Sequence, residues 1–155
     1  MIQVDVNNDQ VRIRLDEDRL REAVRVILRD ASVSRGEISL AIVDDATICE
    51  LHGKYLGEAE PTDVLSFALE RGEHSLDGEV IVSAETAEVT SRWYGWAAED
   101  ELLLYVIHGT LHLVGYDDAT PPQKAEMRER ESAYLAHFGL RVPQEDASQI
   151  DPDLA

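Results

Sequence analysis

Disulfide pairs, membrane spans and an excess of basic charge are all missing from this sequence of 155 residues. Its single cysteine, Cys49, excludes an intramolecular disulfide and fits a reducing compartment. No apolar run reaches the roughly 18 residues that a membrane-spanning helix needs, so we expect no membrane partner. The opening residues have no basic segment leading into an apolar one, so we expect no signal peptide. Together these absences predict a cytoplasmic protein.

Basic side chains are scarce overall. Lysine and arginine number 14 against 32 aspartates and glutamates, which gives a formal net charge of −18. This balance disfavours broad nonspecific binding of nucleic acid, because such binding depends on neutralising phosphates. Seven of the 14 cations fall within the first 35 residues, so a local basic face remains compatible with the composition. We interpret the acidic excess mainly as a source of solubility.

Hydrophobic periodicity predicts one domain over residues 1–142 and an acidic, flexible tail over residues 143–155. Residues 2–6 and 11–15 read as two strands joined by a turn, or as one bulged strand. Further strands are expected at residues 37–44, 63–69 and 79–83, and helices at residues 17–30, 46–56, 84–96, 99–114 and 121–139. Asp16, Thr120 and either Asp44 or Asp45 are the expected helix N-caps. The order predicts an α+β fold with a small mixed sheet of about four strands, flanked by helices.

The most apolar of these helices carries two histidines, His108 and His112, within the stretch "VIHGTLHLVGYDD". A spacing of four residues places both imidazoles on one face of a helix, with Cβ atoms roughly 5–6 Å apart. Helical zinc sites use this spacing. The sequence therefore predicts a metal site on a buried helix.

A third ligand must come from beyond the helix, because Gly115 can end it and reverse the chain. Asp118 lies three residues after this glycine, and Asp117 is the competing carboxylate. Three protein ligands leave a fourth position for water or substrate, as in catalytic zinc sites. The residue after the first histidine is Gly109, where H-E-x-x-H metalloproteases have their catalytic glutamate, so a protease of that type is disfavoured.

These residues make up a motif that resembles a known family. "HGTLHLVGYDD" is similar to the H-G-x-L-H-L-x-G-Y-D-H signature of the YbeY-type endoribonucleases, which are bacterial rRNA maturation factors. "PTDVLSFAL" at residues 61–69 and "DGEVIVS" at residues 77–83 resemble two strands of that family. The resemblance covers roughly residues 35 to 140.

The resemblance implies a zinc-dependent hydrolase that cleaves single-stranded RNA, matures the rRNA of the small ribosomal subunit and acts in ribosome quality control. It implies one Zn²⁺ ion, or another divalent transition metal, on His108, His112 and Asp118, which would be both the ligands and the catalytic residues. The family has a histidine where this chain has Asp118, and a carboxylate oxygen also binds zinc at nearly the same bond length. The implied partners are rRNA, the small subunit and ribosome-associated proteins.

Further candidates lie around the expected cleft. We assign Asp117, Tyr55, Lys54, Asp63 and Ser66 to substrate contact or to support of the ligands. Asp117 could equally be a simple turn residue, and Asp63 a structural hydrogen-bonding group.

One position departs from the family in a way that bears on activity. Leu56 stands where the family has an arginine that is thought to contact phosphate, so we expect reduced nuclease efficiency. The alternative is a non-catalytic ribosome-assembly factor that keeps the fold and the metal site. A third possibility is a metallohydrolase of small substrates.

Overall fold

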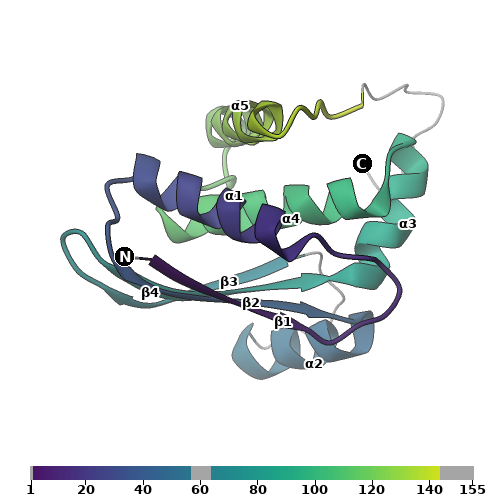
Figure 1. The fold of residues 1–155 in the computed structure, drawn as a ribbon, viewed down its shortest axis with the longest axis horizontal. Coiled ribbons are helices and arrows are strands. Elements are labelled where there is room, and N and C mark those ends of the chain that lie inside the picture. Colours follow the sequence, from purple (N-terminus) through teal and green to yellow (C-terminus); the bar gives the residue numbers. More distant parts are fainter. Residues whose placement is uncertain (1, 57–63, 144–155) are drawn as a thin grey trace.

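A four-stranded sheet with helices on both faces forms the framework of the molecule (Figure 1). The computed structural model describes residues 2–56 and 64–143, and for residues 52–56 it describes only the backbone. The predicted tail lies outside the described residues from position 144 onward. Within the described residues the elements are, in order, β1 (Ile2–Asn8), α1 (Glu17–Asp30), β2 (Gly36–Val43), α2 (Asp45–Leu56), β3 (Val64–Arg71), β4 (Leu76–Ser83), α3 (Ala84–Tyr94), α4 (Ala98–Leu113) and α5 (Pro121–His137).

The sheet is mixed. Its strand order is β1-β2-β4-β3, with β1 parallel to β2, β2 parallel to β4, and β3 antiparallel to β4. β1, α1 and β2 form a parallel β-α-β unit, and β3 and β4 form a hairpin at the opposite edge. The expected α+β fold with a small mixed sheet of about four strands is therefore confirmed.

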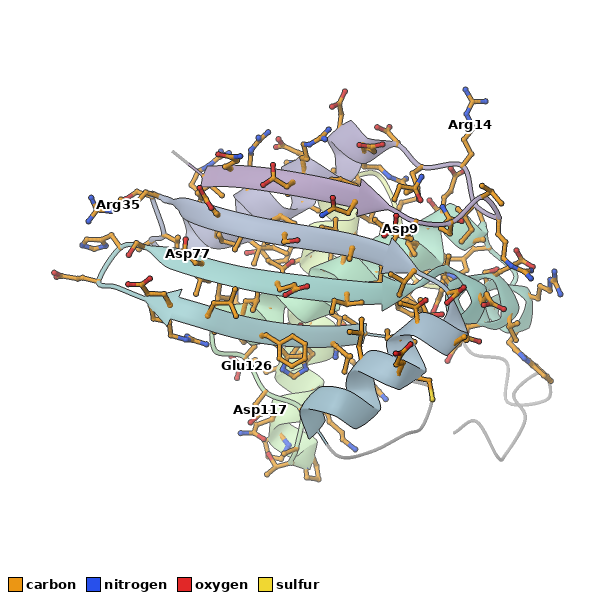
Figure 2. The ribbon with its side chains drawn as sticks, turned by 90° about the horizontal axis from the view of Figure 1, so that it is seen from below. Asp9, Arg14, Arg35, Asp77, Asp117 and Glu126 are labelled. Carbon is orange, nitrogen blue, oxygen red and sulfur yellow. The ribbon has the colours of Figure 1, made fainter. Side chains whose placement is uncertain are left out.

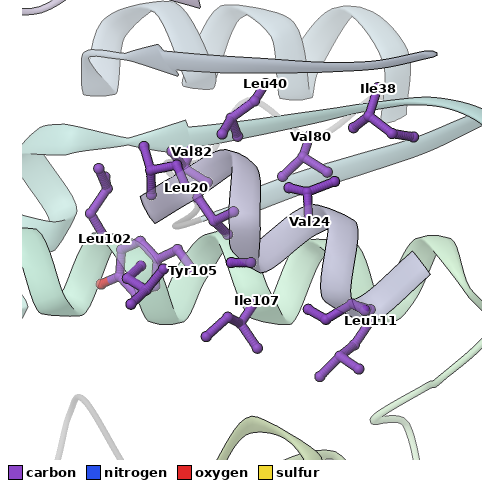
Figure 3. Close-up of a cluster of buried hydrophobic side chains, with 14 of the residues drawn as sticks. Leu20, Val24, Ile38, Leu40, Val80, Val82, Leu102, Tyr105, Ile107 and Leu111 are labelled. Atoms are coloured by element: carbon purple, nitrogen blue, oxygen red, sulfur yellow. The ribbon is translucent and has the colours of Figure 1, made fainter. Parts of the chain in front are cut away.

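Each strand divides its apolar residues between the two faces of the sheet, because successive side chains of a strand point in opposite directions. One face packs against α1 and α4 and contributes most of the core (Figure 3), with Ile38, Leu40, Ile42, Val80 and Val82 all buried. On the other face, Val43, Leu65 and Ile81 pack with Ile48 of α2. Figure 2 shows that α2 covers only part of this second face and that Asp77 lies on the part left open.

Helix α4 is the central element. It contacts β3 and β4 on one side and α1, α3 and α5 on the others, and α5 lies beyond it from the sheet (Figure 1). This burial explains why the helix is apolar on nearly every side. Neither α4 nor any other helix of the described residues is long and apolar enough to cross a membrane.

Local capping fixes several of the helix boundaries. Asp16 accepts a hydrogen bond from the backbone N–H of Arg19, and Thr120 and Gln123 form the expected capping box. Of the two candidates at the start of α2, Asp44 accepts a hydrogen bond from the backbone N–H of Thr47 at 2.7 Å. Hydrogen bonds from the side chain and backbone of Thr47 hold the pKa of Asp44 below its ordinary value.

The expected strand at residues 11–15 is wrong. Residues 9–16 form an irregular connection in which Val11 is 99% exposed, while Ile13 is buried. The side chain of Gln10 accepts a hydrogen bond from the backbone N–H of Ile13 and donates one to its carbonyl oxygen. These local bonds take up backbone groups that a sheet ladder would need, so the alternating pattern does not become a strand.

Gly109 allows α4 to approach the sheet closely. A Cβ atom at this position would lie 2.7 Å from Val80 Cγ1, 2.8 Å from Val64 Cγ2 and 2.9 Å from Ser66 Oγ. The hydroxyl of Ser66 donates a hydrogen bond of 2.9 Å to the carbonyl oxygen of Gly109. The contact therefore fixes the backbone immediately after His108.

We expect Gly109→Ala to destabilise the protein, although alanine is the better helix former. The added methyl group overpacks the contact with β3 and β4, at a cost of about 1–3 kcal/mol. Urea unfolding followed by circular dichroism measures the change. Ser132→Ala on the exposed face of α5 is the control and should change stability by less than about 0.5 kcal/mol. A Gly109→Ala protein as stable as the wild type would contradict the close-contact interpretation.

Tyr134 provides a second test of packing, because its hydroxyl donates a hydrogen bond of 2.7 Å to Asp30 and so joins α5 to the end of α1. Burial, followed by the bond to Asp30, raises the pKa of Tyr134. The raised pKa favours the neutral phenol in the folded state, so its contribution is complete below pH 10 and is lost as the pH rises further.

Tyr134→Phe should lower the free energy of unfolding by about 0.5–1 kcal/mol near pH 7, since the bond lies at the surface. The difference between the two proteins should shrink above pH 10. Urea unfolding of both proteins from pH 7 to pH 11 measures this difference in the free energy of unfolding. A difference that grows with pH would contradict the expected direction of the pKa shift of Tyr134.

Candidate metal centre

His108 and His112 lie in the C-terminal half of α4 and face each other. Their Nε2 atoms are 3.1 Å apart, and the two rings meet nearly edge to face with centroids at 4.6 Å. The spacing of four residues in a regular helix accounts for this proximity. Two ring nitrogens so close need a proton or a cation between them.

The chain reverses immediately after α4. Gly115 has a φ of +105°, in the region where a glycine is favoured, and the backbone N–H of Tyr116 donates a hydrogen bond to the carbonyl oxygen of Leu111. The reversal carries Asp118 back toward the histidines. Asp118 Oδ2 lies 3.5 Å from His108 Nε2, and Oδ1 lies 3.5 Å from His112 Nε2.

The geometry of these three side chains fits a metal ion. Within the described parts of the chain they form the one group of three or more histidine, cysteine or acidic residues whose ligand atoms all lie within 4.8 Å of one another. Tetrahedral ligands at zinc bond lengths lie roughly 3.3 Å apart. The separation of 3.1 Å between the two Nε2 atoms is close to this value, and one oxygen of Asp118 lies 3.5 Å from each of them, Oδ2 from His108 and Oδ1 from His112.

The group is open to solvent on one side. The exposed fractions of the side chains are 23% for His108, 28% for His112 and 41% for Asp118. A structural zinc site is closed by four protein ligands, whereas three partly exposed ligands leave a position for another molecule. The arrangement is therefore suited to chemistry at the metal.

Asp117 occupies a different place from Asp118. It is exposed and lies at the margin of the molecule near the start of α5 (Figure 2). Its carboxylate accepts a hydrogen bond of 2.9 Å from the backbone N–H of Asp118. The structure thus places Asp118 rather than Asp117 in the three-residue group, while Asp117 supports the turn.

Sequence reasoning missed Glu131 of α5. Its Oε2 atom lies 3.0 Å from His108 Nδ1, and its side chain is only 13% exposed. The residue stands 23 positions after His108, and its spacing of four from Met127 and Leu135 is the local signal that places it on the apolar face of α5. Only the packing of α5 on α4 reveals the contact.

Of the other predicted cleft residues, Ser66 is the one whose side chain is described, and it is not part of the three-residue group. Ser66 lies half-buried on β3, where it contacts the backbone of Gly109. Lys54, Tyr55 and Leu56 lie in the last turn of α2, and their side chains are outside the described residues, as is Asp63 altogether. Their assignment to the cleft stays a prediction.

Both positively and negatively charged side chains lie near the three-residue group. The Arg130 guanidinium lies over the ring of Tyr116, 5.6 Å from its centroid, next to the turn that carries Asp118. By contrast, three of the N-terminal arginines, Arg12, Arg19 and Arg21, form ion pairs with acidic residues. Their charges are therefore neutralised locally.

Known proteins resemble this chain over most of its length. The endoribonuclease YbeY from Moorella thermoacetica is 40% identical, over 88% of this chain and 97% of the relative. The endoribonuclease YbeY from Desulfitobacterium hafniense is 42% identical, over 71% of this chain and 76% of the relative.

One solved structure has a similar fold. The solution structure of TM1509 from Thermotoga maritima aligns with a TM-score of 0.58 over 98% of both chains, and at 23% identity this likeness concerns the fold alone. The family model described as endoribonuclease YbeY matches residues 5–139. The chain therefore belongs to the YbeY endoribonuclease family.

Proposed function

We propose that the protein is a metal-dependent endoribonuclease specific for single-stranded RNA, with one Zn²⁺ or other divalent transition-metal ion held by His108, His112 and Asp118. The observation that carries the proposal is the convergence of three donor groups at 3.1–3.5 Å on a solvent-accessible side of α4, in a chain of an endoribonuclease family. The proposed substrate is the rRNA of the small ribosomal subunit in the cytoplasm. The proposed roles are rRNA maturation and ribosome quality control, with ribosome-associated proteins as further partners.

The described residues provide the groups that would bind the metal ion. His108 and His112 each present Nε2 to the shared position, and Asp118 adds a negative charge that attracts a cation. When bound, the ion supplies Lewis-acid chemistry by polarising a phosphoryl oxygen and lowering the pKa of water. Arg130 adds a positive charge beside the turn, which would favour approach of a phosphate backbone to a chain of net charge −18.

Cleavage assays test the activity. Labelled single-stranded RNA and the matching duplex are incubated with the purified protein, then with chelator, then with chelator followed by excess Zn²⁺. We expect cleavage of the single strand, its loss on chelation and its return with the ion. His112→Ala should lower the rate by at least about 100-fold, because the ion loses one of its three ligands.

The control is His74→Ala, which removes an exposed histidine in the β3–β4 turn. Its rate should equal that of the wild type. Cleavage that survives both chelation and His112→Ala would overturn the proposed mechanism. Metal binding without any cleavage of the single-stranded RNA would instead support the non-catalytic assembly factor.

Metal content tests the ligand set directly. Elemental analysis of the untagged wild type should find about one transition-metal ion per chain, as expected for a three-ligand site. Asp118→Ala should weaken Zn²⁺ binding at least about tenfold, whereas Asp118→His should retain the ion because imidazole is an equally good zinc ligand. Glu129→Ala, which removes an exposed acid from α5, is the control and should leave occupancy unchanged. Full occupancy in Asp118→Ala would remove Asp118 from the ligand set.

A further inference from the structure

Glu131 is a carboxylate on the inward face of α5. It lies four residues from Met127 and four from Leu135, both of which are buried, so all three share one face of the helix. The burial of Met127 and Leu135 and the bond from Tyr134 to Asp30 of α1 hold this helix against the rest of the molecule. A carboxylate at such a position needs a partner that offsets its loss of hydration.

The partner is the far nitrogen of the first histidine of the group. Glu131 Oε2 lies 3.0 Å from His108 Nδ1, while His108 Nε2 faces His112 and Asp118. An ionised carboxylate can only accept hydrogen bonds, so the proton of a neutral His108 belongs on Nδ1. The lone pair then lies on Nε2 and points toward the position shared by the three donors.

We propose that Glu131 is a positioning residue that fixes the tautomer and the ring orientation of His108 for metal binding. This inference rests on the proposed metal site and names a group that acts on it through His108. The bond to the carboxylate also makes His108 a more basic ligand. With Asp118, Glu131 brings two negative charges to the surroundings of a divalent cation.

The tautomer can be read without any metal. In chelator-treated protein labelled with ¹⁵N, the shifts of His108 should show a protonated Nδ1 and an unprotonated Nε2. Glu131→Ala should move the population toward the Nε2–H form, which blocks the lone pair that the site needs. Glu131→Gln keeps a carbonyl oxygen that can accept from Nδ1–H, so this variant should largely retain the wild-type tautomer.

Metal affinity is the second readout. Competition of the protein with a chromophoric chelator for Zn²⁺ should show a loss of about 10–100-fold for Glu131→Ala and a smaller loss for Glu131→Gln. Glu129→Ala removes an exposed acid from the same helix and controls for net charge. Circular dichroism confirms that each variant is folded.

The outcomes separate this inference from the proposed function. If Glu131→Ala keeps both the tautomer and the Zn²⁺ affinity of the wild type, or if Glu129→Ala has the same effect as Glu131→Ala, the role of Glu131 is refuted. If the wild type binds no Zn²⁺ but Glu131→Ala still changes the tautomer, the proposed function fails while the positioning contact stands.

Discussion

Helix α4 can reach β3 and β4 only because residue 109 has no side chain, and the arrangement of the site depends on that contact. Val64, Ser66 and Val80 occupy the space that a Cβ would fill, and Ser66 also bonds to the backbone carbonyl of Gly109. The helix is thereby fixed at the residue next to His108. Because protein interiors are close-packed, a shift at this point would be passed to the imidazoles rather than absorbed.

The same helix must be buried and still present polar groups to solvent. Its apolar residues pack against the sheet, α1 and α3. His108 and His112 lie on a partly exposed side of α4, close to the turn at Gly115. Helix α5 covers His108 with a carboxylate rather than an apolar side chain. One side of the ring pair is therefore held by the protein, and the other side stays open for a ligand. Catalytic zinc sites in proteins likewise combine ligands held by the protein with one open position.

Much of the architecture follows from local rules. Periodicity predicts the helices and most strands, and side-chain caps at Asp16 and Thr120 set helix starts within a residue. The alternating pattern at residues 11–15 does not form a strand, because the side chain of Gln10 takes up the backbone hydrogen-bonding groups of Ile13. Strand β4 also begins earlier than expected, at Leu76, because it pairs there with Arg71 of β3 directly across the hairpin turn.

The sequence alone determined the proximity of His108, His112 and Asp118. Helical spacing and a helix-ending glycine are short-range constraints, and they act within eleven consecutive residues. Tertiary structure decided which nitrogen of His108 faces the group and which carboxylate lies against the other nitrogen. Glu131 reaches that histidine because buried Met127 and Leu135 dock α5 on the core. Their spacing places Glu131 on the inward face of α5, but only the packing of α5 on α4 decides which residue it meets there.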